Sequence, residues 1–394
     1  MRLAIIASHP VQYYAPLYRE LAHHLDLTVY YAHRDTAADQ ARAGFGQGFA
    51  WDVDLLSGYQ HLFLQNVARQ PGLGRFAGVD TPGIQAELRA GRFDAVLVMG
   101  WYLKCFLQAV YAAKRAGLPT LVRGDSQLDT PRSRLKRVAK EWLYPPFLRL
   151  FDGALVVGQR NRAYWQHYRY PAAQMFASPH CVDTEWFAAR ATAEARLGLR
   201  ARLGVPAATP LVLFAGKLVE FKRPLDVVHA SAITRRNGLA VEVLVAGSGP
   251  LKDAMQREAA RLQVPMHMLG FCNQTEMPAA YAAADILVLP STGRETWGLV
   301  ANEALACGTR VLLSDAVGCA ADLTAFPGAA KAYPVGNMEQ LAWLMAATLR
   351  EPVNPAAIAS CTAAHSLQAA ASGIVEAVSA LTQPGRRSPV EGTR

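Results

Sequence analysis

The sequence predicts an α/β fold made of two doubly wound parallel sheets. Short, wholly apolar runs alternate with amphipathic segments of helical period along the chain. The apolar runs lack the period of two that marks a half-exposed strand, so we expect strands buried on both faces. A chain of 394 residues also exceeds the size of about 250–300 residues at which one hydrophobic core stops growing, which favours two domains.

The N-terminal half begins with an apolar run that we interpret as a strand. Ser8-His9-Pro10 interrupts this run without a small-residue cleavage site, which argues against a signal peptide. The predicted strands of this half are Leu3–Ala7, Leu27–Ala32, Ala95–Met99, Thr120–Val122 and Ala154–Val157, and the clearest helices between them are Pro16–Leu25 and Leu103–Ala116.

The C-terminal half repeats this alternation after a connecting segment. We expect a helix over Ala188–Leu203 that Gly204-Val205-Pro206 ends, and therefore domains at 1–190 and 200–355. Ala356–Leu381 predicts one long helix, and 383–394 a disordered tail. The predicted strands are Leu211–Ala215, Val241–Ala246, Met266–Leu269, Ile286–Leu289 and Val311–Leu313, and the helices between them include Leu225–Arg236 and Leu251–Leu262.

Composition excludes several classes of protein. With 52% hydrophobic and 18% charged residues the chain is not intrinsically disordered, and no apolar run approaches the roughly 18–20 residues of a membrane span. The net charge of +9 favours an anionic partner, namely a phosphorylated substrate, an anionic membrane face or nucleic acid. The 6 cysteines form no C-x-x-C pair, which argues against a zinc site or a disulfide framework and suits the cytoplasm.

Two glutamates follow the strand at Ile286–Leu289. Glu295 falls in a polar loop and Glu303 on the next helix, which we expect to begin near Trp297-Gly298. A helix start places backbone N–H groups and a positive dipole end beside Glu295, where an anion could bind. The carboxylates would then be left to hold neutral hydroxyls, as in a sugar attached to a phosphate. Taken alone, two glutamates at this spacing are more often solvated surface charges.

The surrounding residues resemble the retaining GT-B glycosyltransferases of family four, also called glycosyl transferases group 1. The resemblance implies that Glu295 holds sugar hydroxyls and that Glu303 holds the ribose of a nucleotide-sugar donor. It also makes Thr296, Trp297, Gly298 and Leu299 donor-binding residues, although Trp297 stands where the family usually has Phe. The matching elements are Pro290-Ser291, Glu295, Trp297-Gly298-Leu299, Glu303-Ala304-Leu305-Ala306-Cys307-Gly308 and the strand Val311–Ser314.

A basic loop adds to the resemblance. Gly216, Lys217 and Lys222 match the family's loop that holds the donor diphosphate. Two cations there can offset the charge that the leaving diphosphate gains, without a metal. Further matches are the turn Val245-Ala-Gly247-Ser-Gly249-Pro250, which is no dinucleotide fingerprint because Lys252 replaces the third glycine, and the segment Pro179-His180-Cys181-Val182-Asp183 before the linker.

The N-terminal half resembles the family less densely. Ser8-His9-Pro10-Val11-Gln12-Tyr13 matches a His-Pro-x-Gln-Tyr variant of some bacterial members, so we expect His9 to face the cleft. Asp125 occupies a position where many members carry a histidine, and it could accept a hydrogen bond from a sugar hydroxyl. The alternative for Asp125 is a loop salt bridge with Arg123. Gly100-Trp101-Tyr102 predicts either a stacking surface for the acceptor or ordinary packing.

Two further stretches leave alternatives open. The basic, aromatic segment 132–149 suits an interfacial helix on anionic lipid, as the resemblance implies, or a surface helix with its apolar face in the core. Asp52-Val-Asp54 matches the D-x-D of metal-dependent sugar transferases, but it lies in a strand-like run. We interpret it as coincidence and expect no metal, no other cofactor and no nucleic-acid partner.

The resemblance implies a GT-B architecture in which two Rossmann-like domains face a cleft. The N-terminal domain would bind a glycan or lipid-linked acceptor, the second domain a nucleoside-diphosphate sugar, and the helix at about 356–382 would pack back on the first. Backbone atoms near Phe271–Asn273 would meet the base. The implied function is retaining sugar transfer in bacterial cell-surface polysaccharide or glycolipid synthesis, in the cytoplasm at the membrane's inner face. The alternatives are an epimerase of GT-B shape, a non-catalytic sugar-nucleotide-binding protein and a glycosidase.

Overall fold

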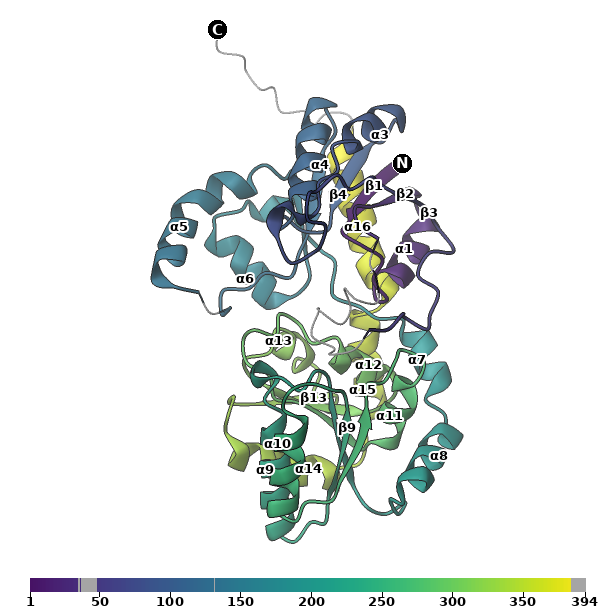
Figure 1. Cartoon of the computed structure of the whole chain (residues 1–394), viewed down its shortest axis with the longest axis vertical. Helices are drawn as coiled ribbons and strands as arrows, with labels where there is room; N and C mark the ends of the chain where they lie inside the picture. The colour runs from purple at the N-terminus through teal and green to yellow at the C-terminus, as the bar shows by residue number, and fades with distance from the viewer. Residues whose placement is uncertain (35, 37–47, 131, 384–394) are drawn as a thin grey trace.

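The computed structural model describes residues 1–34, 36, 48–130 and 132–383. They form two α/β domains stacked along the long axis of the molecule (Figure 1). Within these residues, the N-terminal sheet has 7 strands in the order β3-β2-β1-β4-β5-β6-β7, and the C-terminal sheet has 6 in the order β10-β9-β8-β11-β12-β13. The registered strand pairs of both sheets are parallel, as the uninterrupted apolar runs predict.

The sequence predicts the central strands of both sheets to within one or two residues and misses the edge strands β3, β7 and β13. The missed strands are short, and β3 and β13 are not wholly buried, so they lack the apolar run that marks a central strand. The N-terminal strands are β1 (Arg2–Ala7), β2 (Asp26–Tyr31), β3 (Gln60–Phe63), β4 (Ala95–Val98), β5 (Thr120–Arg123), β6 (Gly153–Val156) and β7 (Met175–Ala177). The C-terminal strands are β8 (Leu211–Ala215), β9 (Glu242–Ala246), β10 (Met266–Gly270), β11 (Ile286–Leu289), β12 (Arg310–Ser314) and β13 (Ala330–Tyr333).

Helices cover both faces of each sheet, and each sheet has one apolar core on either side. Those of the N-terminal domain are α1 (Ala15–Ala22), α3 (Ile84–Ala90), α4 (Lys104–Arg115), α5 (Arg134–Leu148) and α6 (Gln159–His167), with 3-10 turns at η2 (Phe76–Gly78) and η3 (Ala172–Gln174). Those of the C-terminal domain are α9 (Pro224–Arg236), α10 (Lys252–Arg261), α11 (Met277–Ala283), α12 (Val300–Ala306), α13 (Ala320–Leu323) and α14 (Met338–Arg350), with η4 at Glu220–Lys222.

Two expected helices are each divided into two. The connecting segment forms α7 (Thr184–Arg190) and α8 (Ala193–Leu203), and the C-terminal segment forms α15 (Pro355–Ala364) and α16 (Leu367–Thr382). In both cases a hydroxyl side chain caps a new helix, because Thr192 Oγ1 accepts the Ala195 N–H at 3.1 Å and Ser366 Oγ accepts the Ala369 N–H at 3.1 Å. The prediction of one continuous helix over Ala356–Leu381 is therefore wrong.

The end of the chain returns to the N-terminal domain. Helix α16, yellow in Figure 1, lies beside β1 and α1 in the upper domain. Its Ala370, Ile374 and Val378 are buried in one cluster with Leu3 and Leu17. The expected tail at 383–394 falls outside the described residues from position 384 on. No helix in the described part of the chain has the length and apolarity needed to cross a membrane.

Candidate active site

The loops that follow β5 and β11 meet between the two domains. Gln127 Nε2 donates hydrogen bonds to the carbonyl oxygens of Gly293 at 2.8 Å and Glu295 at 3.3 Å. Asp125 Oδ2 accepts a hydrogen bond of 2.5 Å from Thr296 Oγ1. Ligands of open α/β sheets bind at the carboxyl ends of strands, and here those ends come from both sheets. The two domains therefore jointly form the site at which Asp125 and Glu295 lie.

Lys222 and Glu295 form an ion pair in this site. Lys222 Nζ contacts Glu295 Oε2, and the two side chains are 13% and 15% exposed. Ser291 Oγ lies 3.2 Å from the same carboxylate oxygen. Lys222 ends η4, and Arg223 separates it from the start of α9. The loop after β8 and the loop after β11 therefore place the two groups together. A carboxylate and an ammonium in contact can serve adjacent parts of one ligand, its hydroxyls and its phosphates.

Lys217 adds a second ammonium to the loop after β8. Burial lowers the pKa of Lys217, and the nearby charge of Lys222 lowers it further, while Glu295 acts in the opposite direction. Gly216 has a φ of +142°, and Gly247 of the neighbouring turn has a φ of +157°. A Cβ at Gly247 would overlap the carbonyl oxygen of Gly216, so the two turns pack backbone on backbone. Gly247 thus supports the loop that carries both lysines.

The start of α12 supplies free backbone donors beside Glu295. Across the described residues, the N–H groups of Thr296, Trp297 and Gly298 have no protein acceptor. Helix α12 begins at Val300, and Gly298 before it has a φ of +99°, a conformation that favours glycine. Unpaired N–H groups at such a position can bind an anion, as the sequence predicts.

The side chain of Trp297 is a packing element. It is 4% exposed, and its Nε1 donates to Asn302 Oδ1 at 2.9 Å. Its ring centroid lies 5.2 Å from that of His180 and 5.9 Å from that of His365. The Trp297 side chain therefore belongs to the core behind the site, and only its backbone is available to a ligand.

Glu303 lies at a pocket between the domains. The Tyr281 hydroxyl donates a hydrogen bond of 2.5 Å to Glu303 Oε2, and burial raises the pKa of this carboxyl to about 7. Gln12 and Tyr13 of the N-terminal domain line the same pocket, with Asp183 of the linker. The second glutamate thus has one oxygen engaged by Tyr281, and the carboxyl can accept hydrogen bonds from ligand hydroxyls.

His9 lies in the loop that follows β1 in the N-terminal domain. His9 Nδ1 lies 2.9 Å from Ser8 Oγ, and the His9 side chain is half-buried at the carboxyl end of β1. Burial raises the pKa of Tyr13 well above its usual value, and the charges of Asp125 and Arg123 also act on it. Tyr13 therefore lies near the loop after β5, which carries Asp125.

The alternative of a salt bridge between Arg123 and Asp125 is excluded by their partners. Arg123 is 2% exposed, and its Nη2 donates to the carbonyl oxygens of Ser178 at 3.2 Å and Pro179 at 2.9 Å. Asp125 instead bonds to Thr296 in the opposite domain. This arrangement leaves the Asp125 carboxylate at the domain boundary.

Asp52 and Asp54 serve separate structural purposes. Asp52 accepts the Thr275 N–H and contacts its hydroxyl, whereas Asp54 Oδ1 accepts the N–H groups of Leu56 at 3.0 Å and Ser57 at 3.1 Å. The segment is a turn, so the expected strand-like run is wrong. No cluster of at least three His, Cys, Asp or Glu that could hold a metal occurs in the described ranges 1–34, 36, 48–130 and 132–383.

The loop expected to meet the base also touches the N-terminal domain. The ring centroids of Phe271 and Phe49 are 4.4 Å apart, and Asn273 Nδ2 donates to the Ala50 carbonyl oxygen at 2.8 Å. Sequence reasoning missed these contacts, and it also missed Gln127 and Tyr281. No local pattern marks them, because each acts through a partner that is distant in the sequence.

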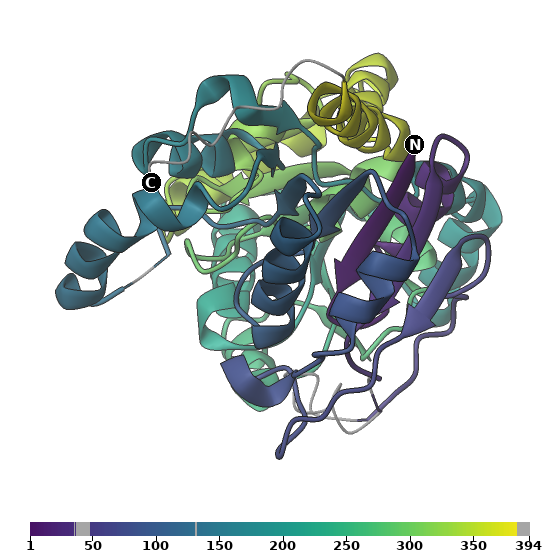
Figure 2. The same cartoon turned by 90° about the horizontal axis from the view of Figure 1, so that it is seen from above.

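Helix α5 carries an exposed apolar stripe. Leu135, Val138, Trp142 and Leu143 are 84%, 59%, 80% and 66% exposed, so the alternative that these residues pack into the core is wrong. Figures 1 and 2 show α5 projecting at the edge of the N-terminal domain. Trp101 is half-buried and stacks at 6.5 Å on Tyr164, so packing accounts for much of its surface.

Comparisons with known proteins find similar sequences. The family described as Glycosyl transferases group 1 matches residues 197–362. A D-inositol 3-phosphate glycosyltransferase of Nocardiopsis dassonvillei is 30% identical over 58% of this chain and 56% of that protein. A GDP-mannose-dependent alpha-(1-6)-phosphatidylinositol monomannoside mannosyltransferase of Mycolicibacterium smegmatis is 29% identical over 51% and 53%. The chain thus spans about half the length of these two curated relatives.

Solved structures resemble nearly the whole chain. A glycosyltransferase from Rickettsia africae superposes with a TM-score of 0.72 at 13% identity, covering 97% of this chain and 99% of that one. Anabaena Alr3699/HepE in complex with UDP and glucose superposes with a TM-score of 0.70 at 16% identity, covering 96% and 100%. At these identities the similarity establishes the fold, and the expected GT-B architecture of two Rossmann-like domains is confirmed.

Proposed function

We propose that this protein is a retaining glycosyltransferase that moves a hexose-type sugar from a nucleoside-diphosphate sugar to an acceptor hydroxyl without a metal. The observation that carries the proposal is the ion pair of Lys222 and Glu295 beside Lys217 and the free N–H groups of the α12 start. This set offers cations and N–H donors for a diphosphate and a carboxylate for hydroxyls. The match of residues 197–362 to Glycosyl transferases group 1 supports it.

On the donor side, Lys217, Lys222 and the N–H groups at Thr296, Trp297 and Gly298 bind the diphosphate. As the glycosidic bond stretches, negative charge grows on the leaving phosphate, and these fixed charges and dipoles offset it. Binding draws Lys222 toward the phosphates and frees Glu295 to accept sugar hydroxyls. Glu303 accepts the ribose hydroxyls in the neighbouring pocket.

On the acceptor side, Asp125 and His9 face the reacting hydroxyl. A phosphate oxygen of the donor takes the proton of the attacking hydroxyl on the face that the diphosphate leaves. The new bond therefore forms on that same face, and the anomeric configuration is retained. No nucleophilic side chain and no further cofactor take part in this route.

The acceptor is a glycan or a lipid-linked molecule of bacterial cell-surface polysaccharide or glycolipid synthesis. Support comes from α5, whose exposed Leu135, Val138 and Trp142 lie among basic residues. Such a helix suits the cytoplasmic face of an anionic membrane. A relative whose name includes phosphatidylinositol monomannoside also favours a lipid acceptor.

A transfer assay tests the proposal. The full chain is incubated with UDP-, GDP-, ADP- and dTDP-sugars and with polyprenyl-diphosphate sugars as acceptors, with and without EDTA. We expect release of a nucleoside diphosphate and a product whose anomeric coupling in NMR shows the donor's configuration, at an EDTA-independent rate. An inverted product contradicts the mechanism.

Three other results would replace the proposed activity. An epimerised donor without acceptor indicates the epimerase, and donor binding without turnover indicates a sugar-nucleotide-binding protein. Release of sugar from nucleotide-free glycosides indicates a glycosidase.

A further inference from the structure

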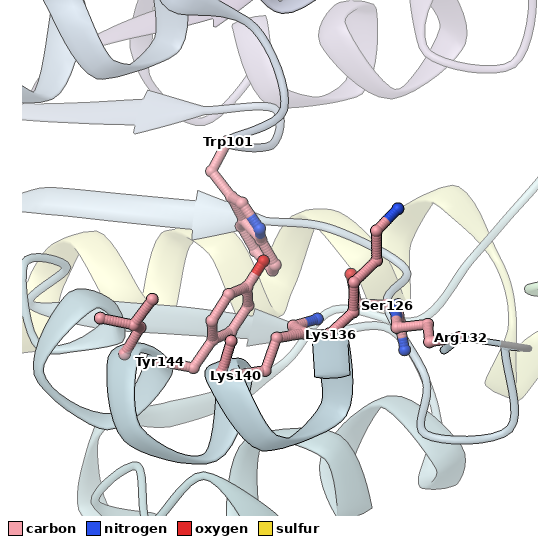
Figure 3. Close-up of a pocket in the computed structure, with 8 residues that line it drawn as sticks. Trp101, Ser126, Arg132, Lys136, Lys140 and Tyr144 are labelled. Carbon is pink, nitrogen blue, oxygen red and sulfur yellow. The ribbon is translucent and has the colours of Figure 1, made fainter. Parts of the chain in front are cut away.

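Cationic side chains gather in a pocket on the N-terminal domain, apart from the lysines of the donor side. Arg132, Lys136 and Lys140 line a cavity of about 400 Å³ together with Trp101 and Tyr144 (Figure 3). The cations come from α5 and the residues just before it, and Trp101 comes from the loop after β4. The cavity is within the size range of small-molecule sites.

Among the residues that the structure describes, no carboxylate lines this pocket. The nearby acids have other partners, since Glu141 lies 2.8 Å from His167 Nε2 and Asp129 pairs with Arg160. Asp125, one residue from the lining residue Ser126, bonds to Thr296. Arg132, one of the lining residues, donates a 3.4 Å hydrogen bond to the backbone carbonyl oxygen of Gln127. In the described part of the chain, no carboxylate forms an ion pair with Arg132, Lys136 or Lys140.

The crowding of cations affects the pKa of Lys140. Its Nζ donates to the Tyr164 hydroxyl at 3.0 Å and lies 3.9 Å from the centroid of the Tyr144 ring. Burial, and then the charge of Arg132, lower the pKa of Lys140 to about 8, while the charge of Glu141 acts in the opposite direction. A bound anion would oppose the effect of the Arg132 charge and stabilise the charged form of Lys140.

The pocket adjoins the candidate active site. Ser126 stands between Asp125, which bonds to Thr296, and Gln127, which bonds to the carbonyl oxygens of Gly293 and Glu295. A Cβ at Gly124 would lie 3.3 Å from the Trp101 ring. Trp101, which lines the pocket, therefore packs on the loop after β5 that carries Asp125. A ligand held in the pocket can therefore extend toward Asp125.

We propose that this pocket binds a phosphate or diphosphate group of the acceptor and so positions the acceptor hydroxyl at the cleft. This inference rests on the proposed transferase function, whose acceptor it defines as phosphorylated. A phosphomonoester carries about −1.5 to −2 charges at pH 7 and offers several strong acceptor oxygens, whereas a carboxylate carries one charge and would leave the cations under-compensated. The parts of Trp101 and Tyr144 that line the pocket give an aromatic surface for the sugar or prenyl part next to the phosphate.

Calorimetry with inorganic pyrophosphate tests the proposal on the full chain. We expect the wild type to bind pyrophosphate at two sites, one on the donor side and one in the pocket. Lys136→Met with Lys140→Met should weaken the pocket site at least tenfold and keep the donor site. Lys217→Met with Lys222→Met should do the reverse. Arg89→Met with Arg162→Met removes the same charge from exposed positions of the N-terminal domain and should change neither site.

The outcomes separate this inference from the proposed function. Two unaltered sites in the Lys136/Lys140 variant overturn the pocket proposal. Two unaltered sites in the Lys217/Lys222 variant overturn the donor assignment and leave the pocket standing. Acetylation footprinting of the wild type gives an independent result, because pyrophosphate should protect Lys136 and Lys140 at least threefold. Unchanged acetylation of both lysines contradicts the proposal even if a variant fails to fold.

Vesicles distinguish the source of the phosphate. Phosphatidylcholine vesicles carry either polyprenyl phosphate or phosphatidylglycerol at matched surface charge. Preferential binding to polyprenyl phosphate that is lost in the Lys136/Lys140 variant identifies a lipid-linked acceptor. Equal binding to both vesicles, with the pyrophosphate site retained in the wild type, identifies a water-soluble phosphorylated acceptor. Lipid binding and pyrophosphate binding that both survive in the Lys136/Lys140 variant overturn the proposal.

Discussion

Lys222 and Glu295 are in direct contact although they lie 73 positions apart in the sequence. Both side chains are mostly buried, and Lys217 lies near enough for its pKa to respond to both of them. The site therefore gathers two ammonium groups around one carboxylate. A diphosphate would bring further negative charge to this cluster, which links the electrostatics of the site to its proposed ligand.

Replacing either partner should abolish most of the activity. We expect Lys222→Ala and Glu295→Ala each to lower kcat/KM by about 10²–10³, because each removes a fixed charge aimed at the transition state. Steady-state kinetics with the identified donor checks this, and circular dichroism checks the fold. Lys252→Ala, at an exposed lysine in the same domain, is the matched control and should retain full turnover. Near-wild-type turnover of a folded Lys222 or Glu295 variant would contradict the assignment.

Donor affinity should rise with pH around neutrality. Burial raises the pKa of Glu303 to about 7, and ribose hydroxyls that donate to the carboxylate favour its ionised form. Protonation therefore competes with the donor, and we expect tighter binding at pH 8 than at pH 6. Calorimetric titrations at both pH values measure it. Glu303→Gln should bind more weakly and lose this pH dependence, whereas the same slope in the variant would rule out Glu303 as its source.

The raised pKa of Glu303 also predicts how the free energy of unfolding depends on pH. The pKa of Glu303 is higher in the folded protein than in the unfolded chain. The contribution of Glu303 to the free energy of unfolding is therefore fully present below pH of about 4.5 and is lost as the pH rises through about 7. Relative to Glu303→Gln, the wild type should lose about 1–3 kcal/mol of unfolding free energy over this window. Urea unfolding at pH 4.5 and 8 checks it. A wild type that gains stability over the variant with rising pH would contradict the sign.

Gly247 should not tolerate a side chain. A Cβ there would overlap the carbonyl oxygen of Gly216, and its φ of +157° disfavours other residues. We expect Gly247→Ala to destabilise the fold by about 2 kcal/mol or more and to weaken donor binding, because the Gly216 turn carries Lys217. Thermal unfolding and calorimetry measure the two effects. Gly238→Ala, at φ +87° with open space around it, controls for backbone strain alone and should leave donor binding intact.

The bond between Asp125 and Thr296 allows a test of what Asp125 does. Thr296→Val removes the 2.5 Å hydrogen bond and keeps the carboxylate, whereas Asp125→Ala removes both. If Asp125 contacts the acceptor, Asp125→Ala should lower transfer at least tenfold more than Thr296→Val, with donor binding unchanged in Asp125→Ala. Transfer rates and donor titrations for both variants check this. Equal losses would make Asp125 a residue that only joins the domains.

The apolar stripe of α5 should matter for membrane contact and not for folding. Leu135 and Trp142 are 84% and 80% exposed, so Leu135→Ser with Trp142→Ser removes little buried surface. We expect unchanged thermal stability and at least a fivefold loss of sedimentation with anionic vesicles. Tyr111→Ser, at a residue 60% exposed on α4, is the control and should sediment as the wild type does. Undiminished vesicle binding of the α5 variant would contradict the proposed contact.

The sequence predicts best what is local. Central strands such as Ile286–Leu289 are wholly apolar, and the helix start after them is marked by Gly298 and the residues around it. The edge strands β3 and β13 escape prediction because solvent covers part of them and no apolar run results. The break before α16 escapes it because a cap by Ser366 outweighs a long alanine-rich pattern.

The sequence predicts which residues belong to the candidate site but not how their side chains are arranged. Its motifs identify Lys222 and Glu295 separately, and only the folded sheets place them in contact. Gln127 carries no motif, yet it joins the domains by bonding to two carbonyl oxygens. The packing of Trp297 between His180 and His365 likewise depends on residues from three segments of the chain.

The most direct measurement is a calorimetric titration of the wild type and of Lys222→Ala with a panel of nucleoside-diphosphate sugars. The account predicts that at least one of them binds the wild type at one site, stabilising it by about 2.7 kcal/mol at a hundred times its Kd, and binds Lys222→Ala at least tenfold more weakly. Silence of the wild type toward every member of the panel, or equal affinity of the two proteins, would contradict it.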